Sequence, residues 1–464
     1  MPWAMPCQPE PATLAIGNGK DRFIMGGNQT IGASILALTL TASAIAAKVE
    51  TKPVTFAKDV APILQAKCEE CHRKGTAAPM SLVTYQETRP WAKAIKERVV
   101  TRQMPPWHID KTVGIQQFSN DRSLTDAQID TIVRWVDAGA PLGDPKDLPP
   151  TKEWPNEEQW VLAKQFGEPD LVIKSDAYTV DAHGQDHWWK PITPVPLTEA
   201  RWVRAVEMRP GSLAGRKVTH HALALLQQEE PGSDPEDFLN GPGLLMEWAI
   251  GKNYDIYRPN SGKLLLPGSQ IRWDIHTHSV GEDIRDHVEL AIYLYPKGET
   301  PKYRTRLTLF GSTGLNGLDI PPNSISETQG FHVLRQPARL ENFQPHMHLR
   351  GKAMSMEAIL PDGATRLLSY VDHFNFNWMN NYIYTDDSAP VLPKGTILKI
   401  TSWYDNTTAN RNNPDPNQWV GYGDRTIDEM GHAWVNVTNI TDDDYKDWLA
   451  KHKPAQPDPA NRRR

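Results

Sequence analysis

Apolar residues recur with two different periods along the chain, and the period changes near residue 165. Three stretches within residues 52–148 have the apolar spacing of helices, and they read VTFAKDVAPILQAKC, RPWAKAIKERVVTRQ and LTDAQIDTIVRWVDAGAP. The last stretch begins in a region typical of an N-cap, SLTDAQ, and ends at Gly139 and Pro141. The pattern predicts three helices that form one unit over 52–148.

From about residue 165 onward, apolar and polar residues alternate as they do in strands. A first series contains RWVRAVEMR, THHALALLQQ, QIRWDIHTHSV and VELAIYLYP. After about residue 320 a second series contains FHVLRQ, HMHLRGKAMSMEAIL, TILKITSWYDN and HAWVNVTN. We therefore expect two tandem antiparallel β-sandwich domains of jelly-roll-like form, over 165–320 and 321–445.

Length and composition fit this multidomain organisation. The chain has 464 residues, enough for about three domains, and it contains 39 Pro and 16 Trp. Residues 149–164 are rich in Pro and charge and predict a linker, and residues 446–464 predict a polar C-terminal tail. The net charge of −6 and the pI near 6.2 provide no basic footprint, so we expect no nucleic acid partner.

The N-terminus has the features of an export signal. Residues 31–47, IGASILALTLTASAIAA, form a short apolar run rich in small residues, and residues 44–46 match an A-x-A cleavage site. Lys20 and Arg22 precede the run, as a positive n-region does. We expect a signal peptide over 1–46 and a periplasmic or otherwise exported protein that meets the membrane only through this segment. An uncleaved N-terminal anchor is the alternative.

The cysteines point to a covalently bound haem. Of three cysteines, Cys7 lies in the predicted signal peptide, and Cys68 and Cys71 stand in CEECH, the C-x-x-C-H signature of c-type haem. The thiols would form thioethers with the haem, and His72 would bind the iron. A redox dithiol or half of a zinc site also uses C-x-x-C, but a second C-x-x-C is missing. We therefore expect residues 52–148 to form an α-helical cytochrome c domain.

The sixth ligand of the haem iron has several candidates. Met104 lies in RQMPPWH after the second predicted helix, and its thioether would raise the haem potential. Met80 is only eight residues past His72, which is close for a ligand on the opposite haem face. His108 is a further competitor, and Met104 could also be an ordinary core methionine. Met104 is the prediction.

Paired histidines recur on the predicted strands. The chain has 15 histidines, and the pairs are His220 with His221, His276 with His278, and His346 with His348. Residues i and i+2 of a strand share a face, but adjacent residues do not. His220 and His221 can bind one metal only if the strand twists or ends there, or if they use different ring nitrogens; otherwise one of them binds. Imidazole suits copper and zinc, and a thioether such as that of Met430 selects copper(I).

Four segments, VTHHALALL, WDIHTHSVG, PHMHLRGKAM and DEMGHAW, together resemble the copper type II, ascorbate-dependent monooxygenases. This family includes peptidylglycine α-hydroxylating monooxygenase and dopamine β-hydroxylase, and the resemblance covers about 165–445. It implies that each of two β-sandwiches holds one copper ion. It also implies that O2 hydroxylates a C–H bond of a small organic substrate.

The resemblance also implies which residues bind the two copper ions. The first copper would be held by His220, His221 and His276, with His278 as the alternative third ligand. The second, oxygen-activating copper would be held by the expected catalytic residues His346, His348 and Met430. The first site would store and relay one electron to the second.

Two departures from the family pattern bear on the substrate. The mature chain has no cysteine left for the disulfides of the eukaryotic members. Gln344, His432 and Trp434 stand where the peptidylglycine enzymes grip a substrate carboxylate, so peptide amidation is not expected. Trp434 indicates a flatter or more apolar substrate, or else a core tryptophan.

The predicted function is an exported copper-dependent monooxygenase with two copper ions. The haem would supply or relay its electrons, replacing ascorbate or mediating from it, and an upstream donor would reduce the haem. A non-catalytic periplasmic electron-transfer or copper-binding protein is the alternative from another class. Structural zinc in the histidine clusters is a third interpretation, which Met430 and the lack of cysteine weaken.

Overall fold

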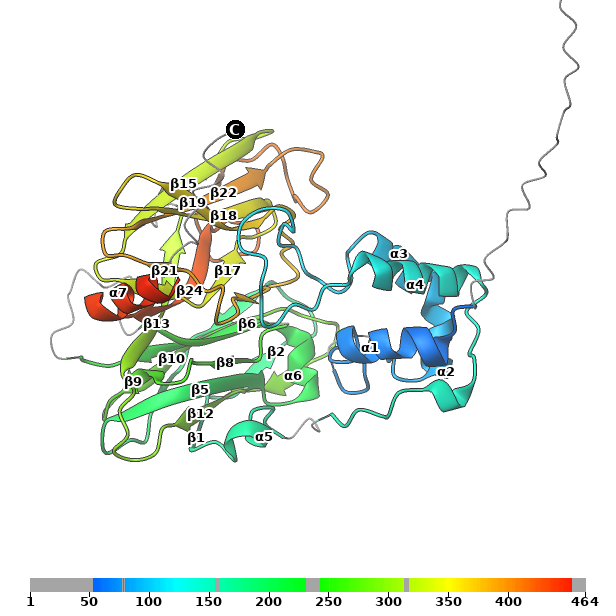
Figure 1. Ribbon diagram of the computed structural model, residues 1–464, viewed down its shortest axis with the longest axis horizontal. Coiled ribbons are helices and arrows are strands. Elements are labelled where there is room, and N and C mark those ends of the chain that lie inside the picture. The colour runs from blue at the N-terminus through cyan, green and yellow to red at the C-terminus, as the bar shows by residue number, and fades with distance from the viewer. Residues whose placement is uncertain are drawn as a thin grey trace, which may run out of the picture. The chain divides into compact units, whose positions relative to one another are not determined.

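The computed structural model describes most of the chain from residue 53 to residue 452 (Figure 1). The described residues are 53–76, 78, 80–154, 159–230, 243–249, 251–312 and 317–452. The predicted signal peptide and the end of the predicted tail lie outside them.

The described helices are short. They are η1 (Phe56–Val60), α1 (Ala61–Lys67), α2 (Tyr85–Thr88), η2 (Arg89–Trp91), α3 (Ala92–Val100), α4 (Asp126–Asp137), η3 (Pro145–Asp147), α5 (Ala163–Phe166), α6 (Leu213–Val218) and α7 (Asp442–Lys451). The longest of them, α4, has 12 residues and begins with a capping box in which Thr125 and Gln128 bond each other's backbone N–H groups. Phe56, Leu64 and Trp135 bury the apolar faces of η1, α1 and α4 in one small core.

The predicted α-helical cytochrome c domain is wrong. The chain folds predominantly as β-sheet, and the described residues form no large helical domain. The stretch between α3 and α4 explains this difference from the prediction. It pairs and packs with the β-rich part of the chain, so it does not belong to a separate helical domain. Ile109 and Phe118 form bridges with Val371 and Tyr384, and the N–H of Ile115 donates to the Leu368 carbonyl at 2.8 Å.

Strands are the main secondary structure after residue 170. Up to residue 311 they are β1 (Leu171–Lys174), β2 (Tyr178–Val180), β3 (His187–Trp189), β4 (Ile192–Pro194), β5 (Arg201–Pro210), β6 (Thr219–Gln227), β7 (Leu244–Ala249), β8 (Tyr254–Ile256), β9 (Ser261–Leu265), β10 (Gln270–Thr277), β11 (Ile284–Asp286), β12 (Val288–Leu294) and β13 (Tyr303–Gly311). The later strands are β14 (Asp319–Ile320), β15 (Ile325–Val333), β16 (Ala338–Leu340), β17 (Asn342–His346), β18 (Gly351–Ile359), β19 (Thr365–Val371), β20 (Tyr382–Ile383), β21 (Val391–Leu392), β22 (Ile397–Asp405), β23 (Val420–Gly421) and β24 (His432–Asn439).

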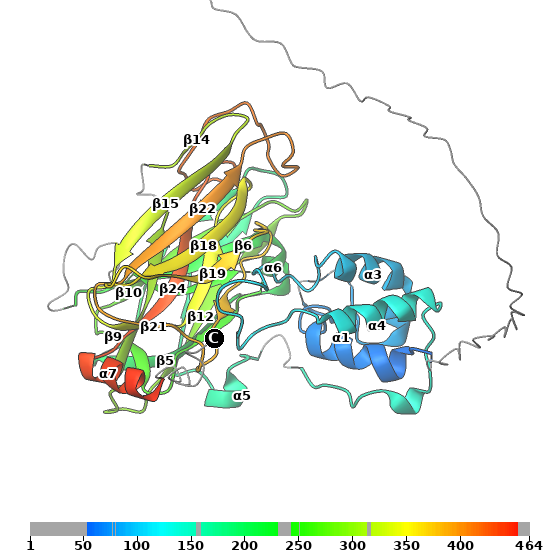
Figure 2. The ribbon, with the colours of Figure 1, turned by 45° about the horizontal axis from the view of Figure 1, so that its top comes forward.

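The two halves of the β-rich part share one sheet, so the prediction of two tandem β-sandwiches is also wrong. A 16-stranded sheet contains β1 and β12 of the first half and β16, β17 and β24 of the second. β13 pairs with β24 over seven residue pairs, from Thr305↔Thr438 to Gly311↔His432. This pairing crosses the predicted domain boundary at residue 320. A separate sheet has four strands in the order β15-β22-β18-β19, and Figure 2 shows these strands lying next to one another.

Each half nevertheless has its own apolar core. One core lies within residues 173–294 and includes Trp273 and Leu290. The other includes Phe343 and Ile400, together with Ile109 and other residues from the stretch between α3 and α4. The shared sheet and the two cores hold the ends of β6, β10, β17 and β24, which carry the histidines, in fixed positions.

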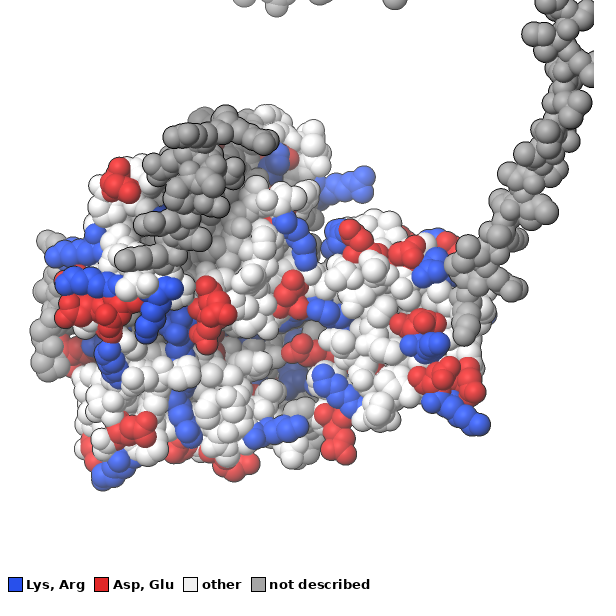
Figure 3. Space-filling model, in the orientation of Figure 1, with Lys and Arg blue, Asp and Glu red and all other residues white. Residues whose placement is uncertain are grey.

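Within the described residues, no helix is long and apolar enough to cross a membrane. On the face drawn in Figure 3, basic and acidic side chains are interspersed.

Candidate metal centre

Three histidines from two neighbouring strands converge at one end of the large sheet. His221 on β6 lies directly opposite His276 on β10, and the next pair in register is Thr219 with Thr277. His220 is therefore an extra residue in a β-bulge, which changes the direction of the strand locally. The bulge explains how adjacent histidines reach one point, since their Nδ1 atoms are 3.1 Å apart. We call His220, His221 and His276 the first histidine group.

The first histidine group has the geometry of a metal site. One nitrogen from each ring lies within 4.8 Å of the nitrogens of the other two. His276 Nε2 bonds Asp186 Oδ2 at 3.1 Å, and His276 Nδ1 is buried without a hydrogen-bond partner in the described residues. The bonded carboxylate fixes the ring and leaves Nδ1 for a metal. His278, the alternative third ligand, is not in this group, and its ring centroid is 6.5 Å from that of His220.

Asp186 also connects the first histidine group to a distant loop. Its Oδ2 accepts a hydrogen bond from the Thr426 hydroxyl at 2.5 Å, and Thr426 lies four residues before Met430. Burial alone would raise the pKa of the Asp186 carboxyl, but the bond from Thr426 and the nearby His276 lower it below its usual value. The carboxylate is therefore an anion that orients His276. The Trp188 ring stacks on the His276 ring, with 4.2 Å between centroids.

The second pair of predicted histidines lies at the end of β17. His346 is the last residue of this strand, and His348 follows in a turn, with 5.3 Å between the two ring centroids. His348 Nδ1 lies 3.1 Å from the Asp428 carbonyl, which leaves Nε2 for a metal. His346 Nδ1 is buried without a hydrogen-bond partner in the described residues.

A histidine that the sequence did not predict as a ligand completes this cluster. His432 is the first residue of β24 and stacks on His346 with 4.7 Å between ring centroids. We call His346, His348 and His432 the second histidine group. The antiparallel pairing of β17 with β24 could have identified it, because His346 and His432 stand opposite each other in register.

Met430 precedes β24 in a segment that Glu429 holds in place. The buried Glu429 carboxylate accepts hydrogen bonds from the backbone N–H groups of His348 at 2.8 Å, Arg350 at 2.5 Å and Met430 at 3.3 Å. Burial raises the pKa of Glu429 to about 7. The Tyr404 hydroxyl donates to the Met430 carbonyl at 3.1 Å. These bonds fix the His348 turn and the half-buried Met430 relative to each other.

The two histidine groups adjoin each other. The ring centroids of His221 and His346 are 6.1 Å apart. Phe376 stacks on His220 at 4.8 Å between centroids and meets the edge of His348 at 5.7 Å, so that one aromatic ring contacts both groups. The structure therefore brings the two predicted ligand pairs, together with His276, into one continuous histidine cluster.

Burial keeps these histidines neutral. It lowers the pKa of His220 and His348 to about 4 and that of His432 to about 3, and neighbouring histidines add to the effect. The pKa values of His276, His221 and His346 are lowered for the same main reason. A neutral imidazole has the lone pair that a metal ligand needs. The donor set and the two buried nitrogens without partners fit a bound metal ion.

The predicted haem-binding residues follow α1. Cys68 is the C-cap of this helix, and the His72 N–H donates to the Cys68 carbonyl at 2.9 Å. Both thiols are free and half-buried; burial raises the pKa of Cys68 to about 12 and that of Cys71 in the same direction. His72 Nδ1 bonds the Met80 carbonyl at 3.3 Å, which leaves Nε2 for an iron. These residues fit a c-type haem.

The candidates for the sixth haem ligand lie in different surroundings. Met104 is half-buried in the loop after α3, where its N–H donates to the Arg98 carbonyl at 3.2 Å. Met80 packs against the small helical core. The His108 N–H donates to the Tyr382 hydroxyl at 3.2 Å, in the β-rich part of the chain.

The residues at the expected substrate positions are buried in polar and apolar contacts. Gln344 Oε1 accepts a hydrogen bond from Lys252 Nζ at 3.0 Å, and Gln344 Nε2 donates to Glu247. Trp434 packs with Leu244 and Leu307 in a small core between the two halves. Trp434 is buried in this core, and its ring also contacts the ring of His432 with 5.1 Å between centroids.

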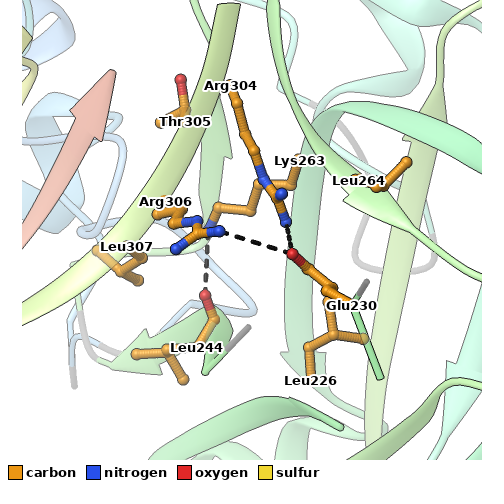
Figure 4. Close-up of a pocket in the computed structure, with 9 residues that line it drawn as sticks. All are labelled: Leu226, Glu230, Leu244, Lys263, Leu264, Arg304, Thr305, Arg306 and Leu307. Atoms are coloured by element: carbon orange, nitrogen blue, oxygen red, sulfur yellow. Dashed lines mark hydrogen bonds and ion pairs between the residues drawn. The ribbon is translucent and has the colours of Figure 1, made fainter. Parts of the chain in front are cut away.

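A small cavity lies elsewhere in the shared sheet (Figure 4). Glu230 forms ion pairs there with Arg304 and, at 3.6 Å, with Arg306. Lys263 Nζ donates to the carbonyls of Leu244 and Leu245 at 3.1 Å each. Neither histidine group lines this cavity, and its glutamate, arginines and lysine already have the partners just described.

Comparisons with known proteins show no family for this chain. No family model and no curated protein matches the chain. Among solved structures, it is similar to the major capsid protein P2 of bacteriophage PM2, at 9% identity over 58% of this chain and 97% of that chain, with a TM-score of 0.25. A structure of infectious bursal disease virus Gx strain matches at 10% identity over 58% and 71%, with a TM-score of 0.17. TM-scores this low support no argument about fold or function.

Proposed function

We propose that this chain is an exported copper-dependent monooxygenase that hydroxylates a C–H bond of a small organic molecule with O2. The observation that carries the proposal is the pair of adjoining histidine groups, each with a buried ring nitrogen that has no partner in the described residues. A buried polar atom without a partner costs about 1–3 kcal/mol, and a bound metal ion removes this cost. Neutral imidazoles suit copper as well as zinc, iron and nickel, and the thioether of Met430 favours copper(I) among them.

The reaction places defined demands on the residues of the site. One oxygen atom of O2 enters the C–H bond and the other leaves as water, which consumes two electrons and two protons from outside the substrate. Copper, when bound, would supply the redox and O2 chemistry. His346, His348 and Met430 would hold the ion that meets O2, while His220, His221 and His276 would hold its electron-storing partner. Asp186 and Glu429 would orient these ligands through the bonds described above.

A covalent haem is the proposed source of single electrons. Cys68 and Cys71 would bind it, His72 would bind the iron through Nε2, and Met104 is the proposed sixth ligand. One contact supports a route toward the first histidine group. Arg216 of α6, the helix that leads into His220, donates to the Gly75 carbonyl just after CEECH at 3.5 Å. Ascorbate or another upstream donor would reduce the haem.

The Met430→Ile variant tests the proposal. We expect loss of O2-dependent turnover together with an unchanged haem spectrum and normal folding, because only a copper ligand is removed. In the wild-type protein, anaerobically reduced haem should reoxidise in a burst only when copper is present. Identical reoxidation with and without copper would instead favour a non-catalytic electron-transfer or copper-binding protein. A wild-type copper-to-haem ratio near zero would refute both copper sites.

A further inference from the structure

His432 stands directly opposite His346 at the edge of the histidine cluster. β17 and β24 pair in antiparallel register, with Gln344 opposite Trp434 and His346 opposite His432. Directly opposed residues of neighbouring strands project on the same face of the sheet. The two rings stack with their planes inclined by 28°, and the His432 ring also meets the edge of Trp434 at 5.1 Å.

The surroundings of these rings satisfy few of their nitrogens. His346 and His432 are 5% and 7% exposed, and no hydrogen bond of the His432 ring is found among the described residues. His346 Nδ1 is likewise without a partner. Stacked imidazoles in a buried place usually bond carbonyls, carboxylates or water. His276 of the first histidine group shows the same unsatisfied Nδ1. Among the described residues, only that first group has one nitrogen of each ring within 4.8 Å of the others, so the rings of the second group must turn to bind one ion.

We infer that His432 is a metal ligand and that His346, His348 and His432 together hold the second copper ion. This inference deepens the proposed function and rests on it. His348 contributes Nε2, because its Nδ1 is committed to the Asp428 carbonyl. Met430, two residues earlier, becomes a fourth donor rather than the one that completes the site. Each of the two copper ions then has three imidazole ligands, and the thioether distinguishes the second ion from the first.

The His432→Phe variant tests the inference in the full-length protein with haem attached. Phenylalanine keeps a flat ring against His346 but removes both nitrogens. We expect equilibrium titration with copper(I) to show two ions bound by the wild type, and one bound tightly by the variant. Affinity for the second ion should fall at least about tenfold. The matched control is His373→Phe, since His373 lies in the same half with its side chain 84% exposed; it should bind two ions.

The outcomes separate this inference from the proposed function. A folded His432→Phe protein that binds two copper ions with wild-type affinity overturns the inference and leaves the proposed function standing. A wild type that binds no copper overturns both. X-ray absorption of the copper-loaded wild type provides a measurement that needs no variant. It should show three imidazoles for each copper ion on average, and a smaller average, with only two imidazoles at the ion that also has sulfur, would overturn the inference.

Discussion

Single side chains decide which ring nitrogens remain free in the two histidine groups. In the first histidine group, Asp186 binds His276 Nε2 and so leaves Nδ1 as the free atom. Trp188 stacks on the same ring and limits its rotation. In the second histidine group, the Asp428 carbonyl has the opposite effect on His348, whose Nε2 remains free. In the proposed copper sites, these neighbouring residues would therefore orient the histidine ligands.

Replacing Asp186 should weaken the proposed first copper site. In Asp186→Ala, His276 loses the carboxylate that fixes its ring, so we expect about a 10–100-fold loss of affinity for the first copper ion. Asp186→Asn keeps an acceptor for His276 Nε2 and should lose less. Copper(I) titration measures both variants, with the exposed Asp181→Asn as the control. Equal affinity in Asp186→Ala and wild type would show that the carboxylate does not position His276.

Elements were predicted more accurately from the sequence than their arrangement. The runs THHALALLQQ and QIRWDIHTHSV contain β6 and β10, because alternation along four or more residues is a local property. The bulge at His220 was not predictable, because it depends on the register between two strands. His432 was missed as a candidate ligand for the same reason: only the pairing of β17 with β24 sets it opposite His346. Asp186 had no sequence signal.

A buried lysine on β9 should make stability depend on pH. Burial lowers the pKa of Lys263 to about 7, whereas in the unfolded chain it is near its ordinary value of 10.5. Between these values the unfolded chain binds a proton that the folded chain lacks, so the free energy of unfolding should rise with pH from about 7 to about 9. Below pH 7 both states are protonated and this dependence ends.

Urea denaturation at a series of pH values measures the effect of Lys263. In Lys263→Met the rise between pH 7 and pH 9 should be absent, since no ammonium remains to be desolvated. Lys297→Met is the control, because the Lys297 side chain is 75% exposed. A rise of the same size in Lys263→Met and wild type would assign the pH dependence to another group.

At the scale of the whole molecule, the β-rich part is joined across its predicted boundary. The sequence resemblance indicated two separate sandwiches, and each half does have its own core. Pairing of β13 with β24 over seven residues nevertheless makes one sheet of the two halves. Buried contacts reinforce this pairing, since Gln344 of the second half bonds Lys252 and Glu247 of the first. Such non-local pairing has no signature in either half alone.

The shared sheet should make both halves unfold together. Ile400 is fully buried in the core of the second half, and Ile400→Ala should cost about 2–5 kcal/mol. We expect calorimetry to show one transition for the β-rich part in the wild type, and one transition at a lower temperature in the variant. Ile325→Ala, at a position 58% exposed on β15, should leave the midpoint nearly unchanged. If Ile400→Ala instead splits the transition into two, with one remaining at the wild-type temperature, then the halves are independent and the pairing of β13 with β24 couples them only weakly.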